Sequence, residues 1–309
     1  MSAAAAQPHK DPRPHKDLSE RTLGFVLLAP AAILLALIVV YPIADLVYSS
    51  FFTIQLAQPW IGEPFVGVEN YLRAFGDERF WHSVLHTAIY AVVTVPGALV
   101  LGLGLAMLAN LPFRRKWPVR LGLLLPWALP LVFAGLIFRW FFDYQQGLVN
   151  DLLIRFGIEP IAWLTQPTLA MAAICIAILW KTSSFMALML LAGLQTIPRS
   201  LYEAAEVDGA SKWQQFVEIT LPMLRPAIFV ALIFRTITAI QTFDIPYAMT
   251  GGGPGESTET LAMYIHKTTL DFLDFGYGSA LATLMFVISM IATSVYLRHT
   301  RRSTGRGTD

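Results

Sequence analysis

Six apolar stretches, each long enough to cross a lipid bilayer, constrain what this 309-residue chain can fold into. A membrane-spanning helix needs roughly 20 predominantly apolar residues. Only 14% of the residues are charged, whereas about 25% is usual in soluble domains. We therefore predict an all-α, polytopic membrane protein with six transmembrane helices, at about residues 24–48, 84–110, 121–142, 169–194, 227–248 and 278–297.

The positions of Lys and Arg predict which side of the membrane each loop occupies, because cytoplasmic loops carry an excess of these residues. Fifteen of them fall in the two tails and in the loops after the second and fourth stretches. The other side has five: Arg73, Arg79, Arg155 and Lys267 in the loops, and Arg139 near the end of the third stretch. Both termini are therefore expected in the cytoplasm. We divide the chain into a disordered N-terminal tail at 1–22, a membrane domain at 23–298 and a C-terminal tail at 299–309.

The predicted cytoplasmic loop between the fourth and fifth spans has the pattern of two short helices joined by a turn. Ser200 and Glu203 have the spacing of a capping box at a helix start. Gly209 suits a left-handed helix end. A second helix is expected over about 211–219 and should end before Pro222, because proline breaks the helical hydrogen-bond pattern.

The first of these helices would present a small, flat surface with acidic edges. Ala204 and Ala205 have almost no side chain, so a partner backbone could approach them closely. Glu203, Glu206 and Asp208 border this surface and could pair with Arg or Lys of that partner. These properties predict a docking element rather than a catalytic site.

The loop resembles the EAA loop of binding-protein-dependent ABC import permeases, whose pattern is EAA-x3-G-x9-I-x-L-P. Every fixed position matches: Glu203, Ala204, Ala205, Gly209, Ile219, Leu221 and Pro222. Asp208 before Gly209 also fits the common form. The segments 67–71, 191–198 and 243–254 are similar to corresponding parts of the MalF-like, sugar-transporting group of this family. This chain resembles its shorter, six-helix form.

This resemblance implies a type I ABC importer permease in a prokaryotic cytoplasmic (inner) membrane. It implies a complex with a second, MalG-like permease, two ABC ATPase subunits and an external solute-binding protein. A di- or oligosaccharide or related sugar would cross by alternating access. The ATPase-coupling residues would be Glu203, Ala204, Ala205, Asp208 and Gly209. ATP and Mg would bind to the partner ATPases, and this chain would bind no cofactor and catalyse no reaction. Consistent with that role, the sequence has no P-loop motif.

Two cations inside the predicted spans point to a substrate path. Lys181 and Arg235 each cost about 2.5–3.5 kcal/mol at the bilayer centre, so both should face protein or a water-filled cavity. They could bind a solute, or they could pair with backbone carbonyls or a carboxylate of the partner permease. Pro126 and Pro130 interrupt the third span, and broken helices commonly line transport cavities. The predicted path comprises Trp180, Lys181, Ser184, Arg235, Thr238, Gln241, Thr242, Asp244 and Tyr247.

Other functions fit the sequence less well. A secondary transporter or channel for a small polar solute would explain the spans but not the spacing of the cytoplasmic motif. His82 and His86 lie one helical turn apart, but no further metal ligand is evident, so no metal site is expected. The net charge of +1 gives no sign of nucleic-acid binding.

Overall fold

The computed structural model describes residues 19–112 and 117–304, in two compact units that divide after residue 46. Most of the predicted N-terminal tail lies outside these residues, as do Arg114, Arg115, Lys116 and Arg306. Within the described ranges the chain forms helices and two isolated β-bridges but no sheet. The predicted all-α class is therefore confirmed.

The first predicted span is helical throughout. Helix α1 (Glu20–Leu35) passes without a break through a π-helical turn, η1 (Ala36–Val40), into α2 (Tyr41–Ser49). Ser19 caps its start by accepting a hydrogen bond from the Thr22 N–H at 3.3 Å. The run from Arg21 to Ser49 is apolar and long enough to cross a membrane.

Four more helices in the described part of the chain are also long and apolar enough to cross a membrane. They are α4 (Glu78–Asn110), α8 (Pro167–Leu194), the run from Lys212 to Ile240 that contains α11 (Leu221–Ile240), and α14 (Phe275–Thr304). The third predicted span is instead divided into α5 (Trp117–Ala128) and α6 (Leu131–Phe141). Pro130 lies at the division, where it has no N–H to donate to the preceding turn. The six-span topology remains a prediction.

Shorter helices connect these elements. They are η2 (Pro59–Ile61), α3 (Glu69–Gly76), α7 (Leu148–Arg155), α9 (Arg199–Val207), α10 (Lys212–Gln215), η3 (Phe216–Thr220), α12 (Asp244–Thr250), α13 (Leu261–His266) and η4 (Lys267–Asp271).

The fifth predicted span differs from expectation at both ends. The second loop helix does not end before Pro222; α10 continues through the π turn η3 into α11 as one helix. Pro222 lies inside this continuous helix, directly after the π turn η3, where the ordinary hydrogen-bond pattern is already interrupted, so its missing N–H is accommodated. At the other end α11 ends at Ile240, and α12 begins separately at Asp244.

Close contact between α4 and α8 forms the centre of the larger unit. A Cβ at Gly102 would lie 2.5 Å from the Met186 Cβ and 3.0 Å from the Ala187 backbone nitrogen. Glycine is thus required here by the near contact of two backbones, which is how membrane helices commonly associate. These two helices provide the frame on which α5, α6 and α11 pack.

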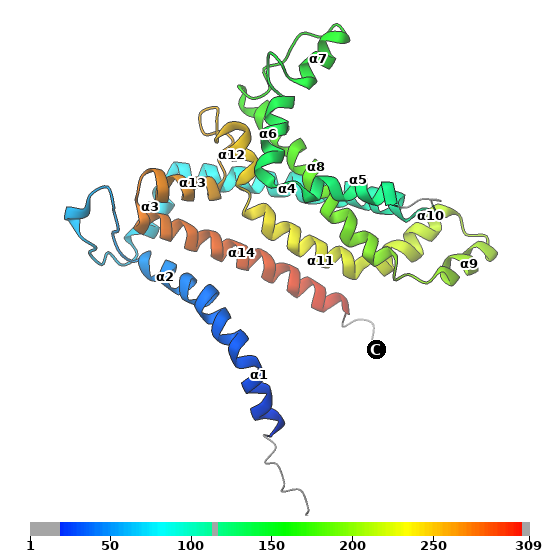
Figure 1. The fold of residues 1–309 in the computed structure, drawn as a ribbon, viewed down its shortest axis with the longest axis horizontal. Helices are drawn as coiled ribbons and strands as arrows, with labels where there is room; N and C mark the ends of the chain where they lie inside the picture. Colours follow the sequence, from blue (N-terminus) through cyan, green and yellow to red (C-terminus); the bar gives the residue numbers. More distant parts are fainter. Residues whose placement is uncertain (1–18, 113–116, 305–309) are drawn as a thin grey trace, which may run out of the picture. The chain divides into compact units, whose positions relative to one another are not determined.

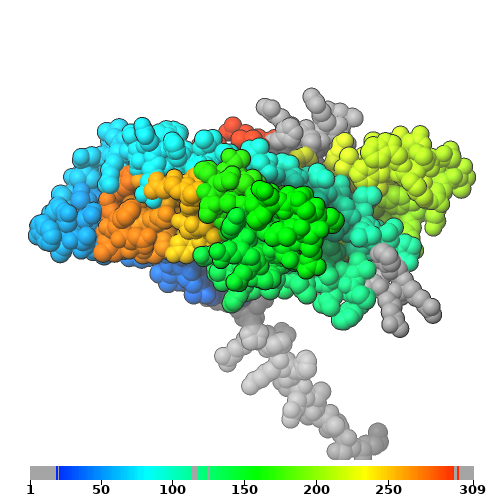
Figure 2. Space-filling model, turned by 90° about the horizontal axis from the view of Figure 1, so that it is seen from above, coloured from blue at the N-terminus to red at the C-terminus, as the bar shows by residue number. Residues whose placement is uncertain are grey.

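Within the larger unit, the predicted coupling loop and the predicted outer elements lie at opposite ends. Figure 1 shows α9 and α10 at one end, and α3 and α13 at the other. The space-filling view agrees, with the yellow-green loop at one extremity and the blue and orange segments at the other (Figure 2). This arrangement accords with the sides inferred from the Lys and Arg distribution.

Candidate functional site

The predicted coupling loop forms a helix–turn–helix whose turn requires glycine. Helix α9 ends at Val207, and Gly209 has φ = +80°, in the left-handed region. The Gly209 N–H donates to the Glu206 carbonyl at 3.1 Å, and the Ala210 N–H donates to the Ala205 carbonyl at 2.8 Å. These two bonds are a Schellman helix end, so the predicted role of Gly209 as a helix-ending residue is confirmed.

The capping box lies at a different helix from the one predicted. Pro198 precedes the first residue of α9 and provides no side-chain cap, so Ser200 is already inside the helix. The capping box is instead formed by Ser211 and Gln214 at the start of α10. The Ser200–Glu203 spacing satisfied the pattern but lies two residues too late, because Pro198 has the extended backbone that starts the helix.

Side-chain contacts hold the two loop helices together. Lys212 forms an ion pair with Glu206, which lowers the pKa of that carboxyl. The Tyr202 and Thr220 hydroxyls hydrogen-bond at 2.8 Å. Glu206 is therefore paired inside the chain, although its side chain stays 53% exposed.

The surface left exposed is suited to docking. Glu203, Ala204 and Asp208 are exposed, and Ala205 is half-buried. Val207 and Trp213 project into solvent with exposed fractions of 87% and 72%. The loop thus presents two large apolar side chains beside small and acidic ones on a preformed element.

Lys181 contacts a helix end rather than a cavity. Its Nζ donates to the carbonyl oxygens of Pro126, Trp127 and Leu129 at 2.7, 2.6 and 2.5 Å. These carbonyls lie where α5 ends, at the negative pole of its dipole. Of the two roles left open by the sequence, the structure shows pairing with backbone carbonyls.

Arg235 is 2% exposed and lies beside a small cavity. Its Nη2 donates to the Thr94 hydroxyl at 2.6 Å, and its Nη1 donates to the Thr238 hydroxyl at 3.4 Å. The Nε has no hydrogen-bond partner, and no acid in residues 19–112 or 117–304 forms an ion pair with this guanidinium. A buried cation without a counter-charge is costly.

The cavity gathers most of the predicted path residues. Its volume is about 90 Å³, and Arg235, Thr238, Gln241, Thr242 and Asp244 line it. Tyr247 lies nearby on α12 and is 45% exposed.

The α8 side of the cavity differs from the one predicted. The residues that line it there are Ile178 and Thr182. Trp180 packs on Phe138 with ring centroids 5.3 Å apart, and Ser184 is buried. Thr182 was missed, although a polar residue one turn after Ile178 on an apolar helix was a signal that could have identified it.

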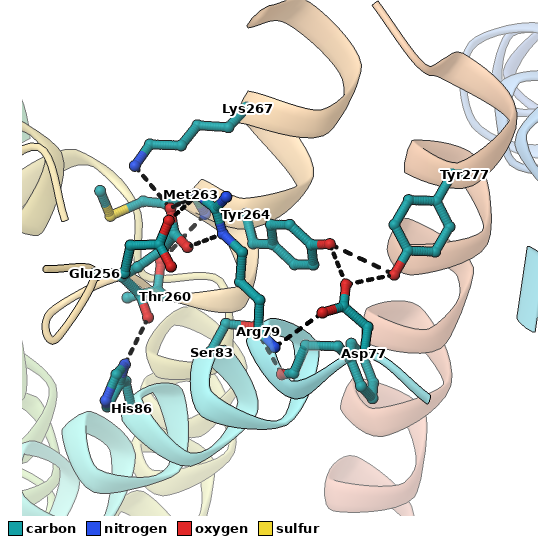
Figure 3. Close-up of polar contacts among 12 residues, drawn as sticks. Asp77, Arg79, Ser83, His86, Glu256, Thr260, Met263, Tyr264, Lys267 and Tyr277 are labelled. Atoms are coloured by element: carbon teal, nitrogen blue, oxygen red, sulfur yellow. Dashed lines mark hydrogen bonds and ion pairs between the residues drawn. The ribbon is translucent and has the colours of Figure 1, made fainter. Parts of the chain in front are cut away.

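A second polar cluster joins the predicted outer ends of three elements (Figure 3). Glu259 is 1% exposed. It accepts two hydrogen bonds from Arg79, at 2.7 and 2.9 Å, and lies 2.7 Å from the Lys267 Nζ. Burial raises the pKa of Glu259, but the two cations outweigh burial and the net pKa is lowered.

Asp77 continues this network toward α14. It accepts hydrogen bonds from the Tyr264 and Tyr277 hydroxyls. These bonds lower the pKa of Asp77 despite its burial, and burial with the bond to Asp77 raises the pKa of Tyr264 to about 12. The cluster therefore ties α4, α13 and α14 together through charges that remain ionised at neutral pH.

Glu259→Gln is expected to lower the free energy of unfolding by roughly 3 kcal/mol, because it leaves Lys267 without its counter-charge and leaves Arg79 only its ion pair with the half-exposed Glu256, at 3.0 Å. Since the folded-state pKa of Glu259 lies below 4.5, its contribution is present above that pH and is lost as the pH falls through the lowered value. Thermal unfolding of the solubilised protein at pH 7 and pH 4 measures both effects. Glu256→Gln is the matched control, since that side chain is half exposed and should matter little. Equal melting temperatures for the two variants would contradict the assignment.

Comparisons with known proteins agree with this architecture. The family model for binding-protein-dependent transport system inner membrane components matches residues 98–305. The sulfoquinovosyl glycerol transport system permease protein SmoG of Agrobacterium fabrum is 66% identical over 91% of both chains. The trehalose/maltose transport system permease protein MalF of Thermococcus litoralis is 40% identical over 90% of this chain and 94% of that protein.

The fold has a counterpart among solved structures. A subunit of a bacterial alginate ABC transporter, in complex with an alginate pentasaccharide-bound periplasmic protein, superposes with a TM-score of 0.80. It covers 95% of this chain and 99% of its own length at 22% identity. The predicted type I importer permease fold is thereby confirmed. Because the family model matches more than half of the chain and close relatives cover nine-tenths of it, this protein is a member of the binding-protein-dependent transport system inner membrane component family.

Proposed function

We propose that this chain is the permease subunit of an ATP-driven importer for a sugar that carries an anionic group. Two relatives are named for sugar transport, one of them for sulfoquinovosyl glycerol, a glycoside with a sulfonate group. The observation that carries the proposal is Arg235, a buried guanidinium that has no acid partner in the described ranges and borders a cavity.

The chemistry of Arg235 suits a sulfonate or carboxylate. A guanidinium presents several N–H donors in one plane, which matches the paired oxygens of such groups. Thr238, Thr242 and Gln241 add hydroxyl and amide groups suited to the hydroxyls of a sugar. Asp244 would disfavour an anion close to its own carboxylate and so would orient the solute.

The residues that line the described cavity form one side of the proposed path. Its volume of about 90 Å³ is below the roughly 300–1,000 Å³ of typical ligand pockets. A second, MalG-like permease opposite this chain would complete a sugar-sized space. Opening of the helices around the cavity would then expose it alternately to the two sides of the membrane.

The coupling loop would transmit the energy for this movement. In the proposed assembly, Glu203, Ala204, Ala205, Asp208 and Gly209 dock on one of two partner ATPases, which bind ATP and Mg. An external solute-binding protein delivers the sugar at the opposite end. The membrane topology has six spans, with α5 and α6 together forming the third and both termini in the cytoplasm.

Arg235→Gln is expected to lower sulfoquinovosyl glycerol uptake by roughly tenfold or more, since a hydrogen bond to a charged group contributes about 1.5–3 kcal/mol. Uptake is measured in proteoliposomes that contain the two permeases and two ATPases, with the binding protein added outside. Arg235→Lys should retain part of the uptake. Arg139→Gln, which removes an exposed arginine of α6, is the matched control.

Two outcomes would refute different parts of this proposal. A stable Arg235→Gln variant with normal uptake would remove Arg235 from the path. Failure of the unmodified assembly to take up the glycoside in an ATP-dependent manner would refute the proposed solute.

A further inference from the structure

Three rings form a cluster beside the Arg235 cavity that the proposed function does not yet use. Phe243 and Tyr247 stack with centroids 4.9 Å apart and planes inclined by 18°. The His266 ring lies 5.1 Å from Phe243 and 5.6 Å from Tyr247. Phe243 precedes α12 and Tyr247 lies in it, whereas His266 is the last residue of α13, so the fold brings the two helices together at this point.

This cluster is open on one side, unlike the buried aromatic core. Phe138 and Phe142 are almost completely buried in a core cluster, whereas Tyr247 is 45% exposed and Phe243 and His266 are half-buried. Full burial would identify the rings as packing residues. Their partial exposure leaves an aromatic face available to another molecule.

The cluster is continuous with the cavity. Phe243 lines the cavity together with Arg235, Thr242 and Asp244. An interfacial aromatic belt would face lipid headgroups. Phe243 instead lies among the polar side chains that line the cavity. The position of the rings therefore favours contact with the transported molecule.

The backbone that carries the rings is held firmly. The Thr260 hydroxyl donates to the Thr242 carbonyl at 2.7 Å. A Cβ at Gly135 of α6 would lie 2.6 Å from the Ala248 Cβ, which shows how closely α12 packs on α6. A rigid support of this kind lowers the entropic cost of binding.

His266 adds a hydrogen-bonding group to the rings. Its Nδ1 is buried and has no hydrogen-bond partner in the part of the chain that the structure describes. A buried polar atom left unpaired costs about 1–3 kcal/mol. A solute hydroxyl that reaches this nitrogen would remove that cost.

From these observations we propose that Phe243, Tyr247 and His266 form a sugar-stacking subsite at the mouth of the Arg235 cavity. The inference rests on the proposed sugar transport and specifies how the ring of the solute is held. The C–H face of a pyranose stacks on the outer face of Tyr247, whose other face is covered by Phe243, and a hydroxyl pairs with His266. The anionic substituent then extends toward Arg235.

The test uses the complete assembly in proteoliposomes, with sulfoquinovosyl glycerol as the probe. Tyr247→Leu removes the ring but retains apolar bulk, and Tyr247→Phe retains the ring. The number of solute molecules taken up per ATP should fall roughly three- to tenfold in Tyr247→Leu, since an aromatic contact contributes about 0.5–1.5 kcal/mol. Tyr247→Phe should stay close to the unmodified protein. His266→Phe should show a smaller loss than Tyr247→Leu.

Phe286→Leu, which changes a similarly exposed ring of α14, is the matched control. ATPase stimulation by the binding protein should stay unchanged in Tyr247→Leu, whereas a general structural defect would lower it. Uptake per ATP equal to that of Phe286→Leu would overturn the subsite. Absence of uptake by the unmodified assembly would instead refute the proposed solute.

If Tyr247→Leu does not assemble, saturation-transfer difference NMR on the unmodified assembly provides a second test of the subsite. Irradiation of the aromatic protons should attenuate the signals of the pyranose C–H protons of the added glycoside. Attenuation supports stacking, and its absence would overturn the subsite without any substitution.

Discussion

Replacing Gly209 with proline is expected to abolish solute uptake while the chain still inserts into the membrane. Gly209 has φ = +80°, whereas proline is fixed near −65°. Proline also lacks the N–H that donates to the Glu206 carbonyl at 3.1 Å. The turn between α9 and α10 would open, and the docking surface around Ala204 would lose its shape. Uptake in proteoliposomes and co-purification of the ATPase subunits measure the two consequences.

Gly157→Pro provides a matched control for this substitution. Gly157 also has a positive φ, +76°, and open space around it, but it lies in a different loop, after α7. Glu203→Lys tests the same surface through charge rather than backbone and should weaken ATPase binding. Unchanged uptake together with unchanged ATPase co-purification in Gly209→Pro and Glu203→Lys would refute the coupling role.

Lys181→Met is expected to cause the largest loss of stability among the span variants. The substitution removes the shared donor of the Pro126, Trp127 and Leu129 carbonyls. These carbonyls lie at the break between α5 and α6. The three bonds are partly buried, and a hydrogen bond to a charged group contributes about 1.5–3 kcal/mol. The melting temperature of the solubilised protein should fall, and uptake should be lost because α6 is no longer positioned against α8.

Ser184→Ala, a buried change one turn away on α8, is the control for Lys181→Met. Lys181→Arg should recover part of the stability, since it supplies donors and charge to the same carbonyls. If Lys181→Met and Ser184→Ala have the same melting temperature, the helix break does not depend on this cation.

The sequence predicted the coupling loop well, because its features depend on neighbouring residues. Features that depend on contacts between residues far apart in the chain were predicted less well. Gly209 could be assigned from sequence because a left-handed helix end depends on neighbouring residues alone. Lys181 was recognised as a costly charge, but its partners lie more than 50 residues away and could not be chosen from the pattern. Glu259 gave no signal at all, because Arg79 reaches it across 180 residues.

The two prolines that were expected to break helices behave differently. Pro130 was expected to interrupt a span and lies at the break between α5 and α6, where Lys181 donates to the carbonyls at the end of α5. Pro222 was expected to end a helix, yet η3 absorbs the irregularity and the helix continues. Pro130 lies at a helix start, whereas Pro222 follows a π turn inside a continuous helix, so the presence of proline alone did not distinguish these two cases.

The uninterrupted helix from Lys212 to Ile240 has the mechanical properties of a lever arm. Its 29 residues extend over about 43 Å at 1.5 Å per residue. Arg235 lies about 35 Å along this arm from Lys212, so a tilt of about 5° at the loop end displaces the guanidinium by roughly 3 Å. A displacement of that size is enough to break the 2.6 Å bond from Arg235 to Thr94. A small rotation that the loop transmits through the π turn η3 and past Pro226 would therefore be amplified into release of a bound anion.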